Sequence, residues 1–179
     1  MKEQKKGISR RHFLGSSLAG MAGIFVLPRL GSSISIPADT DIKLGFIGMG
    51  QQAMFLLNGF LQIPGIQVVA GCDVYGIKRK RFEKRVNAFN TKAGKEAKVV
   101  TYEKFEDLLA RNDINAVVIA VPDHSHARIA IAACKAGKDI YLEKPMTFTI
   151  KEGQELKKAV RQYNRILAVG SQQRSDSGF

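Results

Sequence analysis

From residue 41 onward, short apolar runs alternate with longer amphipathic stretches along the chain. The apolar runs are rich in Val and Ile and several lack polar alternation, which is typical of strands covered on both faces. In the last of these stretches, Ile150–Tyr163, the apolar residues Leu156, Ala159, Val160 and Tyr163 stand at helical spacing, with Lys and Glu elsewhere. The predicted strands are Ile42–Ile47, Gln67–Cys72, Val99–Thr101, Ala116–Val121, Asp139–Leu142 and Ile166–Val169, and the predicted helices are Gln51–Leu61, Ile77–Ala93, Lys104–Ala110, His126–Ala136 and Ile150–Tyr163.

This repeated alternation of strand and helix indicates an α/β fold built on a doubly wound parallel sheet. A chain of 179 residues, 45% of them hydrophobic, has enough apolar material for one core of ordinary size. We expect one domain over residues 41–170.

The net charge of +12 raises the question of a nucleic-acid partner. Residues 1–40 carry six basic and two acidic side chains, a net of +4, and the remaining +8 lies mostly on predicted exposed helices and loops. The basic residues are not accompanied by a nucleic-acid-reading motif or by interleaved aromatic residues. The sequence therefore predicts no nucleic-acid function, and at most an incidental basic patch.

The two cysteines do not form a disulfide framework. Cys72 ends an apolar strand pattern and Cys134 lies in an Ala-rich helix pattern, so both are expected to be buried as small apolar residues. The sequence holds no CxxC motif or His-rich cluster, and we expect no metal site.

The first forty residues have the pattern of an export signal. The segment Ser9-Arg10-Arg11-His12-Phe13-Leu14 follows a lysine-rich start and leads into an apolar run over 13–27. These features are parts of a secretory signal, and the arginine pair resembles the twin-arginine (Tat) consensus. We expect residues 1–40 to be a Tat-type signal peptide and linker that engages the Tat export machinery and directs the protein to the periplasm or another extracytoplasmic site. The alternative is a short amphipathic helix with an incidental arginine pair.

A glycine-rich turn follows the first predicted strand. Residues 48–53 have the pattern G-x-G-x-x-A, a variant of the dinucleotide-binding fingerprint. Gly48 would permit the tight turn, Gly50 would let the backbone approach a pyrophosphate, and Ala53 would allow close packing of helix on strand. The helix that begins near Gln51 would offer free N–H groups and the positive end of its dipole to the phosphates.

An acidic residue stands where the same fingerprint expects one. Asp73 ends the second strand, 23 positions after Gly50, and is a candidate to hydrogen-bond the adenosine ribose hydroxyls. Because a carboxylate repels a 2′-phosphate, Asp73 favours NAD over NADP, although Lys78, Arg79 and Arg81 lie just beyond it and would weaken that preference. The alternative is a glycine-rich turn with an ordinary surface aspartate.

Two further motifs follow predicted strands, Ala-Val-Pro-Asp-His-Ser-His at 120–126 and Glu-Lys-Pro at 143–145. With these, the sequence resembles the N-terminal domain of the glucose–fructose oxidoreductase / inositol dehydrogenase (Gfo/Idh/MocA) family. That domain carries G-x-G-x-x-[GA], an acid after the second strand, A-x-P-[DN]-x-x-H and E-K-P in this order. The resemblance extends over about 42–174 and implies a Rossmann domain that binds NAD, with NADP as a possible cofactor.

The resemblance also implies roles for individual residues. The backbone N–H groups of Gln51 and Gln52 would contact the pyrophosphate, and Pro122 and His126 would shape the nicotinamide-ribose side of the pocket. Lys144 is the catalytic candidate, since its ammonium can hydrogen-bond a substrate hydroxyl and stabilise the charge that develops as hydride leaves. The cofactor-binding candidates are Gly48, Met49, Gly50, Gln51, Gln52, Asp73, Pro122, His126, Glu143 and Lys144.

By the same resemblance, the protein is expected to be an exported NAD(P)-dependent oxidoreductase that acts on a sugar, polyol or related carbohydrate by hydride transfer. Residues 171–179 would begin the connection to a second α/β domain beyond Phe179. That domain would supply most substrate contacts, the other catalytic groups and the surface for a homo-oligomer. Two alternatives stay open. One is an NAD-dependent glycoside hydrolase that cleaves by transient oxidation, and the other is an NAD-binding module without turnover.

Overall fold

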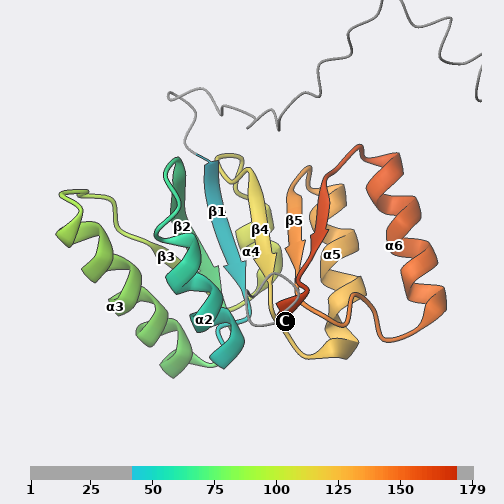
Figure 1. Ribbon diagram of the computed structural model, residues 1–179, viewed down its shortest axis with the longest axis horizontal. Helices are drawn as coiled ribbons and strands as arrows, with labels where there is room; N and C mark the ends of the chain where they lie inside the picture. Colours follow the sequence, from blue (N-terminus) through green and yellow to red (C-terminus); the bar gives the residue numbers. More distant parts are fainter. Residues whose placement is uncertain (1–41, 173–179) are drawn as a thin grey trace, which may run out of the picture. The chain divides into compact units, whose positions relative to one another are not determined.

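Six parallel strands hydrogen-bond side by side in the order β3-β2-β1-β4-β5-β6 in the computed structural model, which describes residues 42–172 (Figure 1). The strand order reverses between β1 and β4, which confirms the predicted doubly wound sheet. The strands are β1 (Ile42–Ile47), β2 (Ile66–Cys72), β3 (Val100–Tyr102), β4 (Ala116–Ile119), β5 (Asp139–Leu142) and β6 (Leu167–Val169). The helices are α2 (Gln51–Phe60), α3 (Gly76–Lys92), α4 (Phe105–Leu109), α5 (His126–Lys135), α6 (Ile150–Gln162) and the 3₁₀ helix η1 (Asp123–Ser125).

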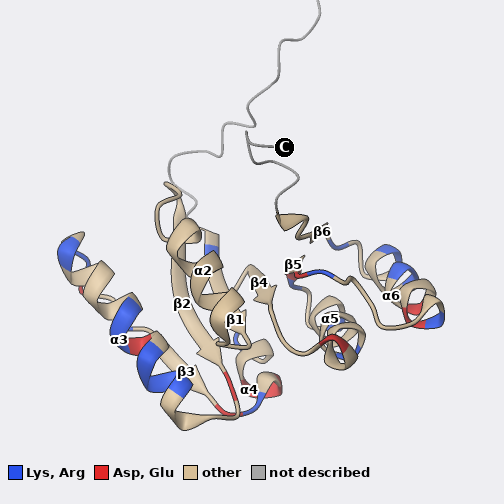
Figure 2. Ribbon diagram, turned by 60° about the horizontal axis from the view of Figure 1, so that its bottom comes forward, with Lys and Arg blue, Asp and Glu red and all other residues tan. Residues whose placement is uncertain are grey.

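Helices cover both faces of the sheet (Figure 2). On one face, Phe46 and Val118 pack with Leu57 of α2 and Phe82 of α3. On the other face, buried residues of α4, α5 and α6 pack against the alternate side chains of the same strands, such as Ile47. Because both faces are buried, the strands have the nearly continuous apolar runs seen in the sequence.

Local signals fix where several elements begin and end. Thr149 caps α6 in a capping box, since its hydroxyl accepts a hydrogen bond from the Glu152 N–H at 3.2 Å while the Glu152 carboxylate accepts one from the Thr149 N–H at 2.9 Å.

Strand β4 ends at Ile119 and not at the predicted Val121. Pro122 has no N–H to continue the ladder, and its carbonyl instead accepts from Ser125 at 2.9 Å to form η1.

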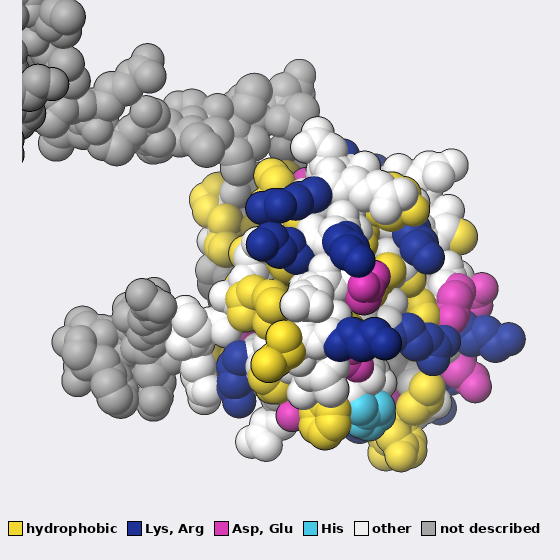
Figure 3. Space-filling view, turned by 90° about the vertical axis from the view of Figure 1, so that its right-hand side faces the viewer, with side chains coloured by type: hydrophobic (Ala, Val, Ile, Leu, Met, Phe, Trp, Pro, Cys, Tyr) yellow, Lys and Arg dark blue, Asp and Glu magenta, His cyan; other side chains and the backbone are white. Residues whose placement is uncertain are grey.

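Both cysteines are buried, free thiols, as predicted. Basic side chains gather along α3 in Figure 2, whereas the face on the α6 side mixes basic, acidic and apolar side chains (Figure 3). No helix within 42–172 has the length and apolar character needed to span a membrane. The predicted export signal lies outside the described residues.

Candidate functional site

A cleft of about 630 Å³ opens at the carboxyl ends of the strands, at the point where the strand order reverses. Its walls come from the glycine turn after β1, from the ends of β2 and β4, and from the first turns of α2 to α5. Ligands of open α/β sheets bind at such a switch point. Of the predicted site residues, Gly48, Gly50, Gln51, Gln52, Asp73 and Pro122 line the cleft.

The two glycines of the turn have different tasks. Gly48 has a φ of +86°, and a Cβ added there would collide with the carbonyl oxygen of Ala120. Its N–H donates to the Cys72 carbonyl at 2.8 Å, so β1 enters the turn still tied to β2. A Cβ added at Gly50 would meet none of the described residues. Gly48 is therefore required by the fold, whereas the missing side chain of Gly50 leaves space for a ligand.

The first turn of α2 presents free backbone donors to the cleft. Gly50 is its N-cap residue, and within residues 42–172 no side chain caps the helix and no acidic residue stands in its first turn. Ala53 is fully buried and lets the helix lie close to the sheet. The donors and the positive dipole end of the helix favour an anion, and a pyrophosphate fits both.

Met49, the middle residue of the glycine turn, is held from three directions. Its N–H donates to the Asp73 carboxylate at 2.8 Å, and its carbonyl accepts from the Arg81 guanidinium at 2.7 Å. Its side chain is fully buried beside Gly71, where an added Cβ would collide with the Met49 Cε. Met49 therefore fixes the shape of the turn from the core and does not line the cleft itself.

Asp73 stands at the end of β2 with only 8% of its side chain exposed. One carboxylate oxygen accepts from Met49, and the other accepts from the Tyr75 N–H at 2.9 Å. A carboxylate has about four acceptor positions, so both oxygens retain capacity for ribose hydroxyls. Lys78 lies on the cleft side, with its Nζ 3.8 Å from the carboxylate.

His126 is buried at the start of α5, with 1% of its surface exposed. Its Nδ1 lies 2.6 Å from the Pro145 carbonyl and its Nε2 lies 2.9 Å from the Val121 carbonyl. The ring therefore joins the turn after β5 to the loop after β4. His126 itself does not line the cleft, whereas Ala120, Val121, Pro122 and Ser125 of the same motif do.

Glu143 follows β5 and is buried, with 4% exposed. Its Oε1 accepts from the Gln52 side-chain amide at 3.0 Å, and its Oε2 accepts from the Lys144 N–H at 3.1 Å. Lys144 itself is exposed. Neither Glu143 nor Lys144 is among the described residues that line the cleft, but the Gln52–Glu143 hydrogen bond joins their turn to the first turn of α2.

Several residues at the cleft were not found from the sequence. The loop after β3 and the start of α4 form one wall, where the Arg128 guanidinium lies 5.2 Å from the centre of the Phe105 ring. Sheet topology alone would have brought this loop to the cleft, since every strand here ends at the same edge.

Cys72 also lines the cleft, and burial raises the pKa of its thiol to about 12. Residues 42–172 hold no group of three or more His, Cys, Asp or Glu side chains suited to a metal ion.

The glycine turn, the uncapped helix and the buried aspartate at the switch point together define a dinucleotide-binding α/β domain. Residues 42–171 match the family model described as "Oxidoreductase family, NAD-binding Rossmann fold" (Gfo/Idh/MocA). The chain therefore belongs to the Gfo/Idh/MocA oxidoreductase family, and the described residues are its NAD-binding domain.

Similar proteins include a glycosyl hydrolase family 109 protein of Solibacter usitatus (strain Ellin6076). It is 34% identical over 159 residues, which cover 83% of this chain and 35% of that protein. A glycosyl hydrolase family 109 protein of Shewanella amazonensis is 31% identical over 165 residues, covering 82% of this chain and 35% of the relative. The chain thus spans about a third of the length of these relatives.

Solved structures agree on the fold. KijD10, a 3-ketoreductase from Actinomadura kijaniata solved with NADP and TDP-benzene, superposes with a TM-score of 0.64 at 26% identity, covering 73% of this chain and 37% of that one. An NAD-binding protein from Listeria innocua has a TM-score of 0.65 at 25% identity, covering 78% of this chain and 38% of that one.

Proposed function

We propose that this chain is the cofactor-binding part of an enzyme that transfers a hydride between a hydroxyl-bearing carbon of a carbohydrate and NAD. The observation that carries the proposal is the hydrogen bond from Gln52 to Glu143 at 3.0 Å. It joins the helix that would bind the pyrophosphate to the turn that carries Lys144. This contact supports our proposal that the Lys144 ammonium acts at the nicotinamide end expected for the cofactor.

The chain's own residues would each contribute a defined part. NAD, when bound, supplies the hydride acceptor. The first turn of α2 would bind the pyrophosphate, and Asp73 would accept hydrogen bonds from ribose hydroxyls. Lys144 would donate a hydrogen bond to the reacting hydroxyl and stabilise negative charge on that oxygen. Glu143 accepts a hydrogen bond from the Lys144 backbone N–H and would fix the direction of the turn.

A second candidate function, hydrolysis of a glycoside through transient oxidation, is supported by the names of the relatives, which are glycosyl hydrolase family 109 proteins. Both candidates use the same hydride transfer and differ in whether the hydride returns to the sugar. Residues outside this chain would complete the substrate site, because the matched residues cover only 35% of the first relative's length.

Incubation of the natural gene product with NAD and, in separate assays, with sugars, polyols and an aryl glycoside distinguishes the two candidate functions. Net growth of NADH absorbance supports a dehydrogenase, whereas release of the aryl group from an aryl glycoside without net NADH supports the hydrolase. Bound cofactor with neither activity would leave a binding module and contradict hydride transfer.

The role of Lys144 has its own test. We expect Lys144→Met to lower turnover about a hundredfold, since removal of one stabilising donor commonly costs this much, while NAD affinity stays close to that of the parent protein. Lys151→Met removes an exposed lysine from α6 and serves as the control. A fully active Lys144→Met protein would remove Lys144 from the proposal.

We also propose that residues 1–40 direct export through the twin-arginine machinery to the periplasm, and that the natural product assembles as a homo-oligomer through the part that follows this domain. The adjacent Arg10 and Arg11 before an apolar run support the proposal of export. Changing both arginines to lysine should retain the protein in the cytoplasm on cell fractionation.

The proposal of a homo-oligomer is tested by light scattering of the natural product, and a monomer would contradict it.

A further inference from the structure

We propose that Gly170, directly after β6, positions the turn that carries Lys144, because its missing side chain leaves the space that the Glu143 carboxylate occupies. The inference rests on the proposed function, in which Lys144 acts on the reacting hydroxyl. Gly170 is buried and is not among the described residues that line the cleft. It therefore acts through Glu143, as a positioning residue.

The main chain fixes Gly170 and Glu143 relative to each other. The Gly170 N–H donates to the Leu142 carbonyl at 2.8 Å, which continues the ladder between β5 and β6 beyond Val169 (Figure 1). The Glu143 N–H donates to the Ile119 carbonyl at the end of β4 at 3.0 Å. Because both backbones are tied to the sheet, only the Glu143 side chain is free to adjust to a change at position 170.

Gly170 is required for space and not for its backbone conformation, since it does not adopt a positive φ. A Cβ added there would lie 2.9 Å from the Glu143 Oε1 and 3.0 Å from the Tyr141 hydroxyl oxygen. Both atoms are the ends of side chains, whereas a Cβ at Gly48 would meet the backbone of Ala120. A methyl group at position 170 would therefore displace the carboxylate and leave the fold intact.

The orientation of this carboxylate holds the turn in place. Its Oε1 accepts from the Gln52 amide at 3.0 Å, and its Oε2 accepts from the Lys144 N–H at 3.1 Å. The Tyr141 ring, which packs edge-on against Phe60 of α2 at a centroid distance of 5.5 Å, restricts the space on the other side. A displaced Glu143 would lose these donors, and small misplacements of a catalytic group lower turnover strongly.

Backbone hydrogen exchange at Lys144, measured by NMR on the full chain, tests this inference without any substrate. We expect Gly170→Ala to speed this exchange about tenfold, because the Lys144 N–H loses its acceptor. The melting temperature should stay within about 3 °C of the parental value. In the natural gene product, turnover of the carbohydrate or glycoside should fall about tenfold or more, while the KM for NAD⁺ changes less than about threefold.

Gly59→Ala is the matched control. Gly59 lies near the end of α2, and a Cβ added there would have no described atom within 4 Å. This variant should leave exchange at Lys144 and turnover unchanged.

A double-variant cycle separates displacement of the carboxylate from general loosening of the domain. Gln52→Met removes the donor to the Glu143 Oε1 and should by itself speed exchange at Lys144. If Gly170→Ala acts through the same contact, adding it to Gln52→Met should change the exchange rate by no more than about twofold. Fully additive effects would overturn the inference.

Parental exchange at Lys144 in the Gly170→Ala variant would also overturn the inference, as would loss of folding, which would make Gly170 a residue of the fold alone. Absence of turnover in the parent protein with sugars, polyols and glycosides would instead contradict the proposed function. The exchange measurements would still decide whether Gly170 orients Glu143.

Discussion

The carboxylate of Asp73 accepts a hydrogen bond from the backbone N–H of Met49 at 2.8 Å, across 24 positions of the chain. The residue expected to bind the ribose therefore also fixes the turn expected to bind the phosphates. Since the Tyr75 N–H binds the other carboxylate oxygen at 2.9 Å, this side chain is oriented before any ligand arrives. Such preorganisation lowers the entropic cost of binding.

Asp73→Ala should therefore weaken NAD binding and also destabilise the fold, because two backbone donors lose their acceptor. We expect a loss of about 1–3 kcal/mol in the free energy of unfolding, measured by urea denaturation. Asp73→Asn keeps one carbonyl acceptor and should recover part of that stability while still binding NAD more weakly than the parent. An Asp73→Ala protein with the NAD affinity of the parent would contradict the assignment of Asp73 as the residue that binds the ribose hydroxyls.

The glycines of the turn should respond differently to the same substitution. Gly48→Ala places a methyl group against the Ala120 carbonyl at a φ of +86°, so we expect it to destabilise the protein by about 1–3 kcal/mol or more. Gly50→Ala meets none of the described atoms and should keep the parental melting temperature but lose NAD affinity. Equal melting temperatures for both variants would contradict the distinction.

The Cys72 thiol should be unreactive towards alkylating reagents in the folded protein, although Cys72 lines the cleft. Burial raises its thiol pKa from 9.0 to about 12, so the reactive thiolate is scarce at pH 8. Between these pKa values the folded state holds a proton that the unfolded state has lost, and stability falls as pH rises above about 9. Iodoacetamide labelling followed by mass spectrometry should modify Cys72 only after unfolding in urea. Rapid labelling of native protein would show that the thiol is accessible.

Lys138 should matter for stability and not for the site. It is buried with 5% exposed, burial lowers the pKa of its ammonium, and its Nζ donates to the carbonyls of Arg111 at 2.6 Å and Ile114 at 2.9 Å. Lys138→Met would leave both carbonyls without this donor, and we expect a loss of about 1–3 kcal/mol in urea denaturation with NAD affinity unchanged.

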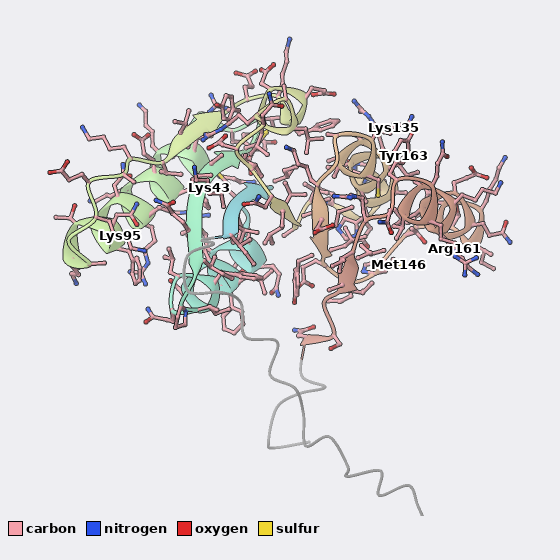
Figure 4. The ribbon with its side chains drawn as sticks, turned by 90° about the horizontal axis from the view of Figure 1, so that it is seen from above. Lys43, Lys95, Lys135, Met146, Arg161 and Tyr163 are labelled. Carbon is pink, nitrogen blue, oxygen red and sulfur yellow. The ribbon has the colours of Figure 1, made fainter. Side chains whose placement is uncertain are left out.

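Lys135→Met is the control for that variant, because Lys135 is exposed at the end of α5 (Figure 4). It should change the free energy of unfolding by no more than about 0.5 kcal/mol. If Lys138→Met were equally neutral, the buried ammonium would not hold the loop between α4 and β4.

The strand and helix pattern predicted most of the fold because both faces of the sheet are buried, which leaves long apolar signals at β1, β2 and β4. The start of α6 at Ile150 was also predictable, and its Thr149–Glu152 capping box fixes it in the structure. The end of β4 was not predictable, because the apolar run in the sequence continues to Val121, whereas Pro122 and η1 redirect the backbone.

The site was predictable where a residue's role depends on neighbours in sequence, as for Gly48 in its tight turn. It was not predictable where a side chain reaches across the sheet. The Gln52 amide bonds Glu143, 91 positions away, and the Arg81 guanidinium bonds the Met49 carbonyl, 32 positions away. No spacing rule reports such contacts, because they depend on how β1, β2 and β5 are arranged side by side.

The packing of Met49 against Gly71 also constrains how this domain can diverge. Gly71 has no unusual backbone conformation, yet a methyl group there would meet both the Met49 Cε and the Phe82 ring. Among homologues, a larger residue at position 71 should therefore occur together with a smaller one at position 49 or 82. Position 71 of β2 should in this way co-vary with the second residue of the nucleotide fingerprint.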